Sequence, residues 1–186
     1  MEQDGVLDIA RLICVAARTA PKARGIDDLE TLVLTDGEKD ALADKMEQMG
    51  KTAEVPFFIR DAGNMREADA AVLLGMTNKR RGVPNCGLCG YADCKANREA
   101  NGLCALSITD LGIAVGSAVS KAADLRADNR ILFTAGRGAV ELSLFAAAAD
   151  SPAAGQTAEQ EGPVVIAYGI PLKVAGKNPF FDRVKK

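Results

Sequence analysis

The sequence contains no histidine and no tryptophan, and the absence of histidine excludes several kinds of site. Without histidine there can be no Ser-His-Asp or Cys-His catalysis, no His-ligated metal and no histidine proton shuttle. Aromatic residues make up only 4% of the 186 residues, whereas hydrophobic residues make up 48%. We therefore expect one full core, built from Ala, Val, Leu and Ile, in a single domain spanning residues 1–186.

An excess of positive charge is also lacking. The 23 Lys and Arg residues are balanced by 25 Asp and Glu residues, which gives a net charge of −2 and a pI near 5.3. General nucleic-acid binders carry a basic excess, so nucleic acid is not an expected partner. No stretch approaches the ~18–20 uncharged apolar residues of a membrane span. The first residues, Met-Glu-Gln-Asp, are acidic where a signal peptide is basic. These features predict a cytoplasmic protein with no membrane partner.

Apolar periodicity predicts an alternation of helices and strands, which is typical of an α+β domain. Apolar residues that recur on one helix face predict a helix at residues 6–17, and further helices are predicted at 38–49, 106–125 and 138–149. Short apolar runs predict strands at 29–35, 55–59, 70–76, 130–134 and 164–169. A flexible loop is expected at 150–162. The region 77–105 lacks long apolar periodicity, and we interpret it as a cysteine-rich loop insertion within the domain.

Small residues mark two places in the sequence, a helix face and a short glycine-containing loop. One side of the predicted helix 106–125 carries Gly112, Gly116 and several alanines, so a neighbouring helix or a cofactor can lie close to it. The sequence has no G-x-G-x-x-G and no Walker A motif. Its nearest approach to a phosphate-binding loop is Gly136-Arg137-Gly138.

Four of the five cysteines fall within 19 positions, with the spacing C-x2-C-x4-C-x9-C. They are Cys86, Cys89, Cys94 and Cys104. In a reducing compartment such a group indicates metal or redox chemistry more than disulfides. Thiolates select zinc, copper(I) or iron–sulfur clusters. A structural zinc site usually pairs two C-x2-C knuckles, and the second is missing. Three ligands from one tight loop and a fourth from a later segment suit a [4Fe-4S] cluster. Zinc, or free or disulfide-bonded thiols, remain the alternatives.

Residues around these cysteines allow two interpretations. Gly87 and Gly90 let the backbone wrap closely and expose N–H groups to anionic cluster sulfurs. The basic residues 79–81 either offset the negative charge of a cluster or belong to a solvated surface loop. Cys14 stands apart on the first predicted helix, and we interpret it as a buried structural thiol.

The run N-C-G-L-C-G-Y-A-D-C at residues 85–94 resembles a known motif. It is similar to the N-C-G-x-C-G-x-x-x-C core of the small [4Fe-4S] domain of electron-transfer and corrinoid iron–sulfur proteins. The nine residues that separate Cys94 from Cys104 are fewer than in that domain. Over nearly its whole length, the chain also resembles a bacterial and archaeal family described as containing a ferredoxin domain. The matching stretches are residues 16–25, the cysteine region, 110–119 and 166–172.

The order of motifs is also similar to that of FMN-dependent nitroreductases. In those proteins a basic segment ends the first helix, a central helix begins D-x-G, and a late strand reads A-L-G-Y-P. Here the corresponding pieces begin at Arg18, Asp110 and Ala167. The resemblance implies that Arg18, Thr19 and Lys22 bind the phosphate and ribityl chain of FMN. The alternative for Arg18 and Lys22 is neutralisation of the C-terminal end of the first helix.

These observations favour a redox protein with a nitroreductase-like sheet-and-helix body and a [4Fe-4S] insertion. A flavin-linked oxidoreductase and a metal-binding scaffold with a purely structural zinc or cluster are the rival functions. No residue stands out as a general acid, base or nucleophile, so no catalytic residue is assigned. A homodimer is expected, since helix 106–125 is apolar and small-faced and the nitroreductases pair through a long central helix. The redox partner protein is unknown.

Overall fold

The computed structural model describes residues 1–145 and 163–181. The helices are α1 (Glu2–Thr19), the short 3-10 turn η1 (Ala23–Gly25), α2 (Asp36–Thr52), α3 (Pro56–Glu67), α4 (Cys94–Glu99), α5 (Ala105–Asp124) and α6 (Phe133–Glu141). The strands are β1 (Leu29–Leu34), β2 (Ala70–Thr77), β3 (Asp128–Asn129) and β4 (Val164–Lys173). Among the described residues, no helix is both long enough and apolar enough to span a membrane.

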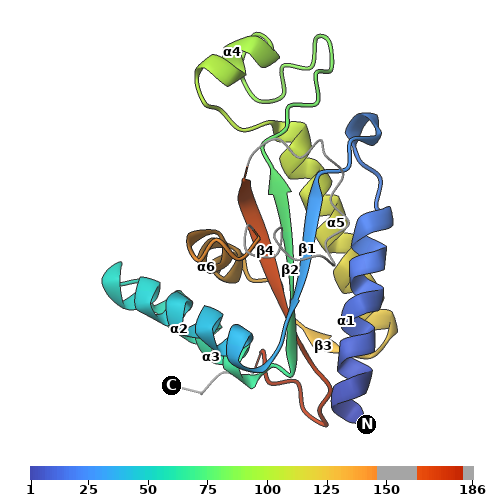
Figure 1. The fold of residues 1–186 in the computed structure, drawn as a ribbon, viewed down its shortest axis with the longest axis vertical. Helices are drawn as coiled ribbons and strands as arrows, with labels where there is room; N and C mark the ends of the chain where they lie inside the picture. The colour runs from blue at the N-terminus through green and yellow to red at the C-terminus, as the bar shows by residue number, and fades with distance from the viewer. Residues whose placement is uncertain (146–162, 182–186) are drawn as a thin grey trace.

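The strands form one antiparallel sheet in the order β1-β2-β4-β3. Helices α1 and α5 lie on one face, and α2, α3 and α6 lie on the other (Figure 1). All eight residues of β2 are buried because this strand is central and both of its faces are covered. A continuous apolar run is what such a position requires.

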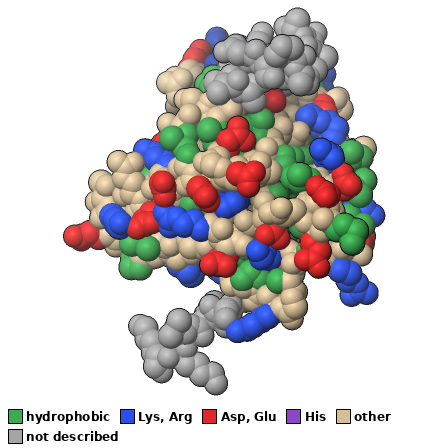
Figure 2. All heavy atoms as spheres, turned by 60° about the horizontal axis from the view of Figure 1, so that its bottom comes forward, with side chains coloured by type: hydrophobic (Ala, Val, Ile, Leu, Met, Phe, Trp, Pro, Cys, Tyr) green, Lys and Arg blue, Asp and Glu red, His purple; other side chains and the backbone are tan. Residues whose placement is uncertain are grey.

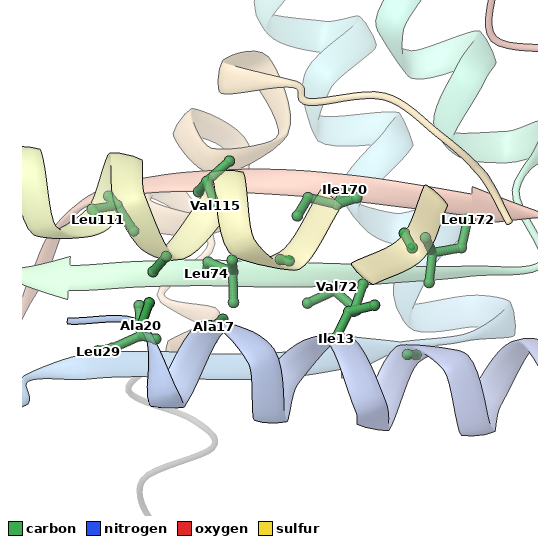
Figure 3. Close-up of a cluster of buried hydrophobic side chains, with 14 of the residues drawn as sticks. Ile13, Ala17, Ala20, Leu29, Val72, Leu74, Leu111, Val115, Ile170 and Leu172 are labelled. Carbon is green, nitrogen blue, oxygen red and sulfur yellow. The ribbon is translucent and has the colours of Figure 1, made fainter. Parts of the chain in front are cut away.

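The two faces of β2 serve two separate clusters of buried side chains. Val72 and Leu74 point into the cluster that α1 and α5 cover (Figure 3). Ala71 and Leu73 point into the cluster beneath α2, α3 and α6. This division follows from the two-residue period of a strand. The core is dominated by aliphatic side chains, as the low aromatic content predicted.

The surface shows no large area of one charge on the face that Figure 2 presents. Acidic and basic side chains alternate there over the body. This mixture agrees with the near-neutral net charge of the sequence.

Most of the predicted elements are present, and two predicted strands are wrong. Residues 55–59 begin helix α3, because Pro56 occupies its first turn, where a missing N–H removes no helical hydrogen bond. Residues 130–134 do not form a strand: Leu132 makes one isolated bridge with Gly169, and α6 begins at Phe133. The helix predicted at 138–149 begins earlier than expected and, as α6, ends at Glu141. Residues 146–149 and the predicted loop 150–162 lie outside the described residues.

Gly136 and Gly138 lie inside helix α6 and pack against other elements, so they form no phosphate-binding loop. A Cβ on Gly136 would lie 1.7 Å from the carbonyl oxygen of Ala167 in β4. A Cβ on Gly138 would lie 2.9 Å from Leu42 of α2. These glycines let α6 approach the sheet and α2 closely.

A buried arginine anchors the segment between β2 and α5, which we call the cysteine segment (residues 78–104). The Arg81 side chain is fully buried between two carboxylates. Its Nη2 donates to Asp28 at 2.7 Å and its Nε donates to Asp110 at 2.8 Å. Asp28 precedes β1 and Asp110 lies in α5, so one side chain joins three distant parts of the chain. The interpretation of residues 79–81 as a solvated loop is therefore wrong for Arg81.

The same carboxylates accept further hydrogen bonds. Asp28 accepts from the Thr77 hydroxyl at 2.8 Å, and Asp110 accepts from the backbone N–H of Ala23 at 3.0 Å. Burial works against the charge on Arg81, but both carboxylates raise its pKa above the ordinary value. The guanidinium therefore stays charged, with its charge compensated within the core.

We expect Gly136→Ala to destabilise the protein by about 1–3 kcal/mol, since the new methyl group would collide with backbone rather than with a movable side chain. Gly63→Ala in α3 is the matched control, because no atom of the described part of the chain lies within 4 Å of the added Cβ. That control should stabilise the protein by about 0.5–1 kcal/mol. Urea unfolding measures both. Equal effects of the two substitutions would contradict the close packing of α6 on β4.

We expect Arg81→Met to lower the free energy of unfolding by about 3–5 kcal/mol, because two buried carboxylates would lose their shared cation. Arg137→Met provides the control: that arginine pairs with Glu141 on an exposed helix surface, where such a pair contributes about 0.3–0.5 kcal/mol. Chemical denaturation distinguishes them. A loss no larger for Arg81→Met than for Arg137→Met would show that the buried network does not hold the fold.

Candidate functional site

The cysteine segment projects beyond the end of the sheet, at the end of the molecule opposite the N-terminus (Figure 1). A cavity of about 330 Å³ lies within it and is lined by Cys86, Cys89, Cys94 and Cys104. The first three cysteines are partly exposed and Cys104 is buried. The structure therefore brings the four predicted cysteines to one cavity.

The backbone around the first two cysteines adopts left-handed conformations that favour glycine. Gly87 has φ of +58° and Gly90 has φ of +80°. The Gly90 N–H donates to the Gly87 carbonyl at 3.0 Å, which closes a tight turn that contains Cys89. No atom of residues 1–145 or 163–181 lies within 4 Å of a Cβ placed on either residue, so the requirement is backbone conformation rather than space.

Cys94 enters the site at the start of a short helix. Asp93 is the N-cap of α4, and its side chain accepts a hydrogen bond from the Ala96 N–H at 2.8 Å. An aspartate at this position satisfies one of the free N–H groups of the first turn. The cap therefore sets the point at which the chain turns from loop to helix, and with it the position of Cys94.

Cys104 is held by two asparagines at the return to the body. The Cys104 N–H donates to the Asn78 side chain at 3.0 Å, and Asn78 donates to the Gly102 carbonyl at 2.9 Å. Asn97 of α4 is buried and donates to the Leu103 carbonyl at 3.0 Å. The segment before Cys104 is thus fixed both to the end of β2 and to α4.

Zinc and a four-iron cluster require different arrangements of the same thiols. Within residues 1–145 and 163–181, no three Cys, Asp or Glu side chains are grouped closely enough to hold one metal ion. A tetrahedral zinc site needs four sulfurs at about 2.3 Å from a single atom. In a [4Fe-4S] cluster each thiolate binds a different iron atom, so the sulfurs surround a larger object. The four thiols line one cavity, so the choice between the two groups depends on how the sulfurs are arranged once a metal group is bound.

The fifth cysteine is remote from this cavity. Cys14 lies on α1 and packs against the core between that helix and the sheet. Burial raises the pKa of the Cys14 thiol to about 11, despite the opposing effect of the Arg18 charge. Because metals bind the thiolate, a thiol with a raised pKa is a poorer ligand than an ordinary cysteine.

The residues predicted to hold a flavin phosphate are brought together, but they already have partners. The Lys22 ammonium is buried and donates to the Arg18 and Ala20 carbonyls at 2.7 and 2.9 Å. Arg18 donates to Asp27 at 3.0 Å, and Lys22 lies 3.6 Å from the same carboxylate. The Thr19 hydroxyl donates to the Val15 carbonyl at 3.0 Å. These are contacts that complete the end of α1.

Several residues that shape the site were not identified from the sequence. The sequence does not point to Asn78 or Asn97, and it considers Arg81 only as an offset to the charge of a cluster, without its buried ion pairs. The hydrogen bonds of these residues join positions 6 to 53 apart, and no local pattern predicts them. Asp93 is different: an aspartate just before a short helix is an N-cap signal that the sequence does contain.

Comparison with known proteins identifies both the family and the fold. A family model described as "Uncharacterized protein containing a ferredoxin domain" matches residues 100–152 and 151–183. An uncharacterized protein of Archaeoglobus fulgidus is 34% identical over 193 residues, which cover 100% of this chain and 95% of that protein.

Solved structures similar to the chain include a nitroreductase with bound FMN from Bacteroides fragilis, with a TM-score of 0.57 and 12% identity over 96% of this chain and 81% of that one. A BluB-like flavoprotein from Clostridium difficile matches with a TM-score of 0.55 and 16% identity, over 96% of this chain and 84% of that one. At these identities the similarity concerns the fold. The chain has a nitroreductase-like α+β fold and belongs to the family of proteins that contain a ferredoxin domain.

Proposed function

We propose that the protein is an iron–sulfur electron-transfer protein whose single [4Fe-4S] cluster is bound by Cys86, Cys89, Cys94 and Cys104. The observation that carries this proposal is that all four thiols line one cavity at the exposed end of the molecule. The family description supports a redox role in general. Zinc held by the same thiols, in a purely structural site, is the alternative that the test below separates.

The donor set and its surroundings fit such a cluster. The cysteine segment has few buried apolar side chains: among its described residues, only Cys104 belongs to the buried hydrophobic set. A segment without an apolar core gains stability from a bound metal group, because binding contributes to folding. Three partly exposed cysteines would leave the cluster close to the surface. When bound, a cluster of this type supplies one-electron transfer.

The chain's own residues would hold and orient the cluster. The left-handed turn at Gly87 and Gly90 presents Cys86 and Cys89 together and leaves N–H groups of the loop for hydrogen bonds to sulfur. The Asp93 cap and Asn78 set the positions of Cys94 and Cys104. The partner would be a redox protein that docks at this end, and reduced thiols fit a cytoplasmic location.

A flavin site at Arg18, Thr19 and Lys22 does not fit the contacts of these residues. An FMN phosphate would have to compete with Asp27 for both cations, and the Lys22 ammonium is already bonded to helix carbonyls. The nitroreductase-like structures described above include one with bound FMN, which is the observation in favour of a flavin. We derive no flavin chemistry for this chain.

Serine substitution of each proposed ligand tests the cluster. We expect about four irons per chain and broad visible absorption in anaerobically prepared wild-type protein. Replacing any one of the four ligands by serine should remove most of that iron and make the cysteine segment sensitive to trypsin. The four variants are Cys86→Ser, Cys89→Ser, Cys94→Ser and Cys104→Ser. Cys14→Ser is the matched control and should keep both the iron and the resistance.

Other outcomes of the same experiment contradict the proposal in distinct ways. Loss of iron in Cys14→Ser together with full iron in Cys104→Ser would show that the fourth ligand is wrong. A colourless protein that contains zinc would favour the structural alternative. A spectrum with the paired bands of a flavin and no iron would favour an oxidoreductase of the nitroreductase type.

We also propose that the protein forms a homodimer through α5. The alanines of its small face are buried within the chain, whereas Gly112, Ile113 and Gly116 are exposed. Among the described residues, nothing lies within 4 Å of a Cβ built on either glycine, so residues 1–145 and 163–181 leave this strip open for close approach by a second helix. A flat strip with one large apolar side chain suits helix–helix contact.

Light scattering tests the dimer, with an expected mass of twice the 19.5 kDa of one chain. Ile113→Glu should shift the mass towards the monomer, because it would bury a charge in the contact. Ile59→Glu, at a similarly exposed isoleucine on α3, should leave the dimer intact. A wild-type mass of one chain at micromolar concentration would contradict the dimer.

A further inference from the structure

Arg80 lines the cysteine cavity and joins the two parts of the chain that lead to the last two cysteines. Its Nε donates to the side-chain oxygen of Asn97 at 2.8 Å, and its Nη2 donates to the Gly102 carbonyl at 3.0 Å. Asn97 lies in α4, which begins at Cys94, and Gly102 lies two residues before Cys104. One guanidinium therefore links both approaches to the cavity.

The charge of Arg80 is compensated differently from that of its neighbour. Arg81 is paired with two buried carboxylates, so its charge is balanced within the core. The hydrogen bonds of Arg80 go to the neutral oxygens of Asn97, Gly102 and Asn78. Across the residues that the structure describes, no carboxylate lies within ion-pair distance of Arg80. A positive charge without a carboxylate partner is thus held in the wall of the cavity.

A partly buried charge in this position acts strongly on whatever occupies the cavity. The dielectric is lower there than in water, and the field of Arg80 is less screened by salt than that of a surface side chain. Four thiolates bring more negative charge to a [4Fe-4S] core than its irons neutralise. Reduction adds one further negative charge, and net charge near the cluster is one of the factors that set its potential.

We infer that Arg80 is both a positioning residue of the proposed cluster and its fixed countercharge. Its positive charge raises the reduction potential of the cluster. Its hydrogen bonds to Asn97 and Gly102 fix the position of Cys94 relative to Cys104. This inference rests on the proposed iron–sulfur function. It assigns two separable tasks to one side chain. The charge favours the reduced cluster, while the planar fork of donors joins Asn97 to Gly102. Lysine can supply the charge but not the fork.

Three variants separate these tasks in the full-length, cluster-loaded protein. Arg80→Gln removes the charge, Arg80→Lys keeps the charge without the fork, and Arg98→Gln removes an exposed charge from α4 that does not line the cavity. The readouts are the reduction potential, from a mediated titration with dithionite as the one-electron reductant, and the rate of iron loss to a chelator. Circular dichroism of each apo-protein shows whether the body remains folded.

We expect Arg80→Gln to lower the ratio of reduced to oxidised cluster at a fixed potential about tenfold, which equals about 59 mV for a one-electron couple. Arg80→Lys should stay within about threefold of wild type in that ratio, yet should lose iron faster, as Arg80→Gln does. Arg98→Gln should match wild type in both measurements at 0.5 M salt, where an exposed charge is screened over about 3–5 Å.

Separate results would overturn the inference and the proposed function. If Arg80→Gln holds a cluster with the potential and iron retention of wild type, Arg80 has neither task. If Arg80→Lys shifts the potential as far as Arg80→Gln does, the effect comes from altered geometry, and the countercharge is refuted. If wild-type protein takes up no iron–sulfur cluster, the proposed function itself fails, whatever the variants do.

Discussion

The salt bridge of Arg81 with Asp28 and Asp110 determines how the cysteine segment is attached to the body. The strand β2 ends at Thr77, four residues before this arginine, and the chain must leave the sheet there without a hydrophobic core to guide it. The buried guanidinium provides that guidance, because both of its partners belong to elements already packed in the body. Burying three charges is costly unless each is satisfied, and in this site all of them are hydrogen-bonded.

The body and the cysteine segment are stabilised by different means. The body buries aliphatic side chains on both faces of a four-stranded sheet and packs α6 closely through Gly136. The cysteine segment relies on polar contacts: an aspartate cap, two asparagines and two arginines. Because the two apolar clusters of the body include no described residue of the segment, loss of the proposed metal group would affect the segment far more than the body. This division would let one end of the molecule carry the proposed metal site while the body stays folded.

The sequence predicts the body well and the supports of the site poorly, for a physical reason. Helix α5 is long, and strand β2 is a nearly continuous apolar run. Both patterns are strong, so both elements were predicted. Residues 55–59 and 130–134 are short apolar runs, for which periodicity cannot distinguish a strand from a helix start. The spacing of the four cysteines indicates that they belong together, and all four line one cavity. The roles of Asn78 and Asn97 depend on tertiary contacts and leave no local pattern.

At the end of α1, the residues that match the cations of a flavin site also have partners within the chain. Arg18 and Lys22 occupy positions that match cationic residues of FMN-dependent nitroreductases, yet both have a structural task here. Lys22 donates to carbonyls that the helix leaves unpaired, and a cation at this end stabilises the helix dipole. Asp27 then pairs with both side chains, at 3.0 Å from Arg18 and 3.6 Å from Lys22. A chain can therefore share the fold and both cations while its own carboxylate, Asp27, pairs with Arg18 and Lys22. The redox chemistry that we propose for this protein is assigned to the cysteine segment instead.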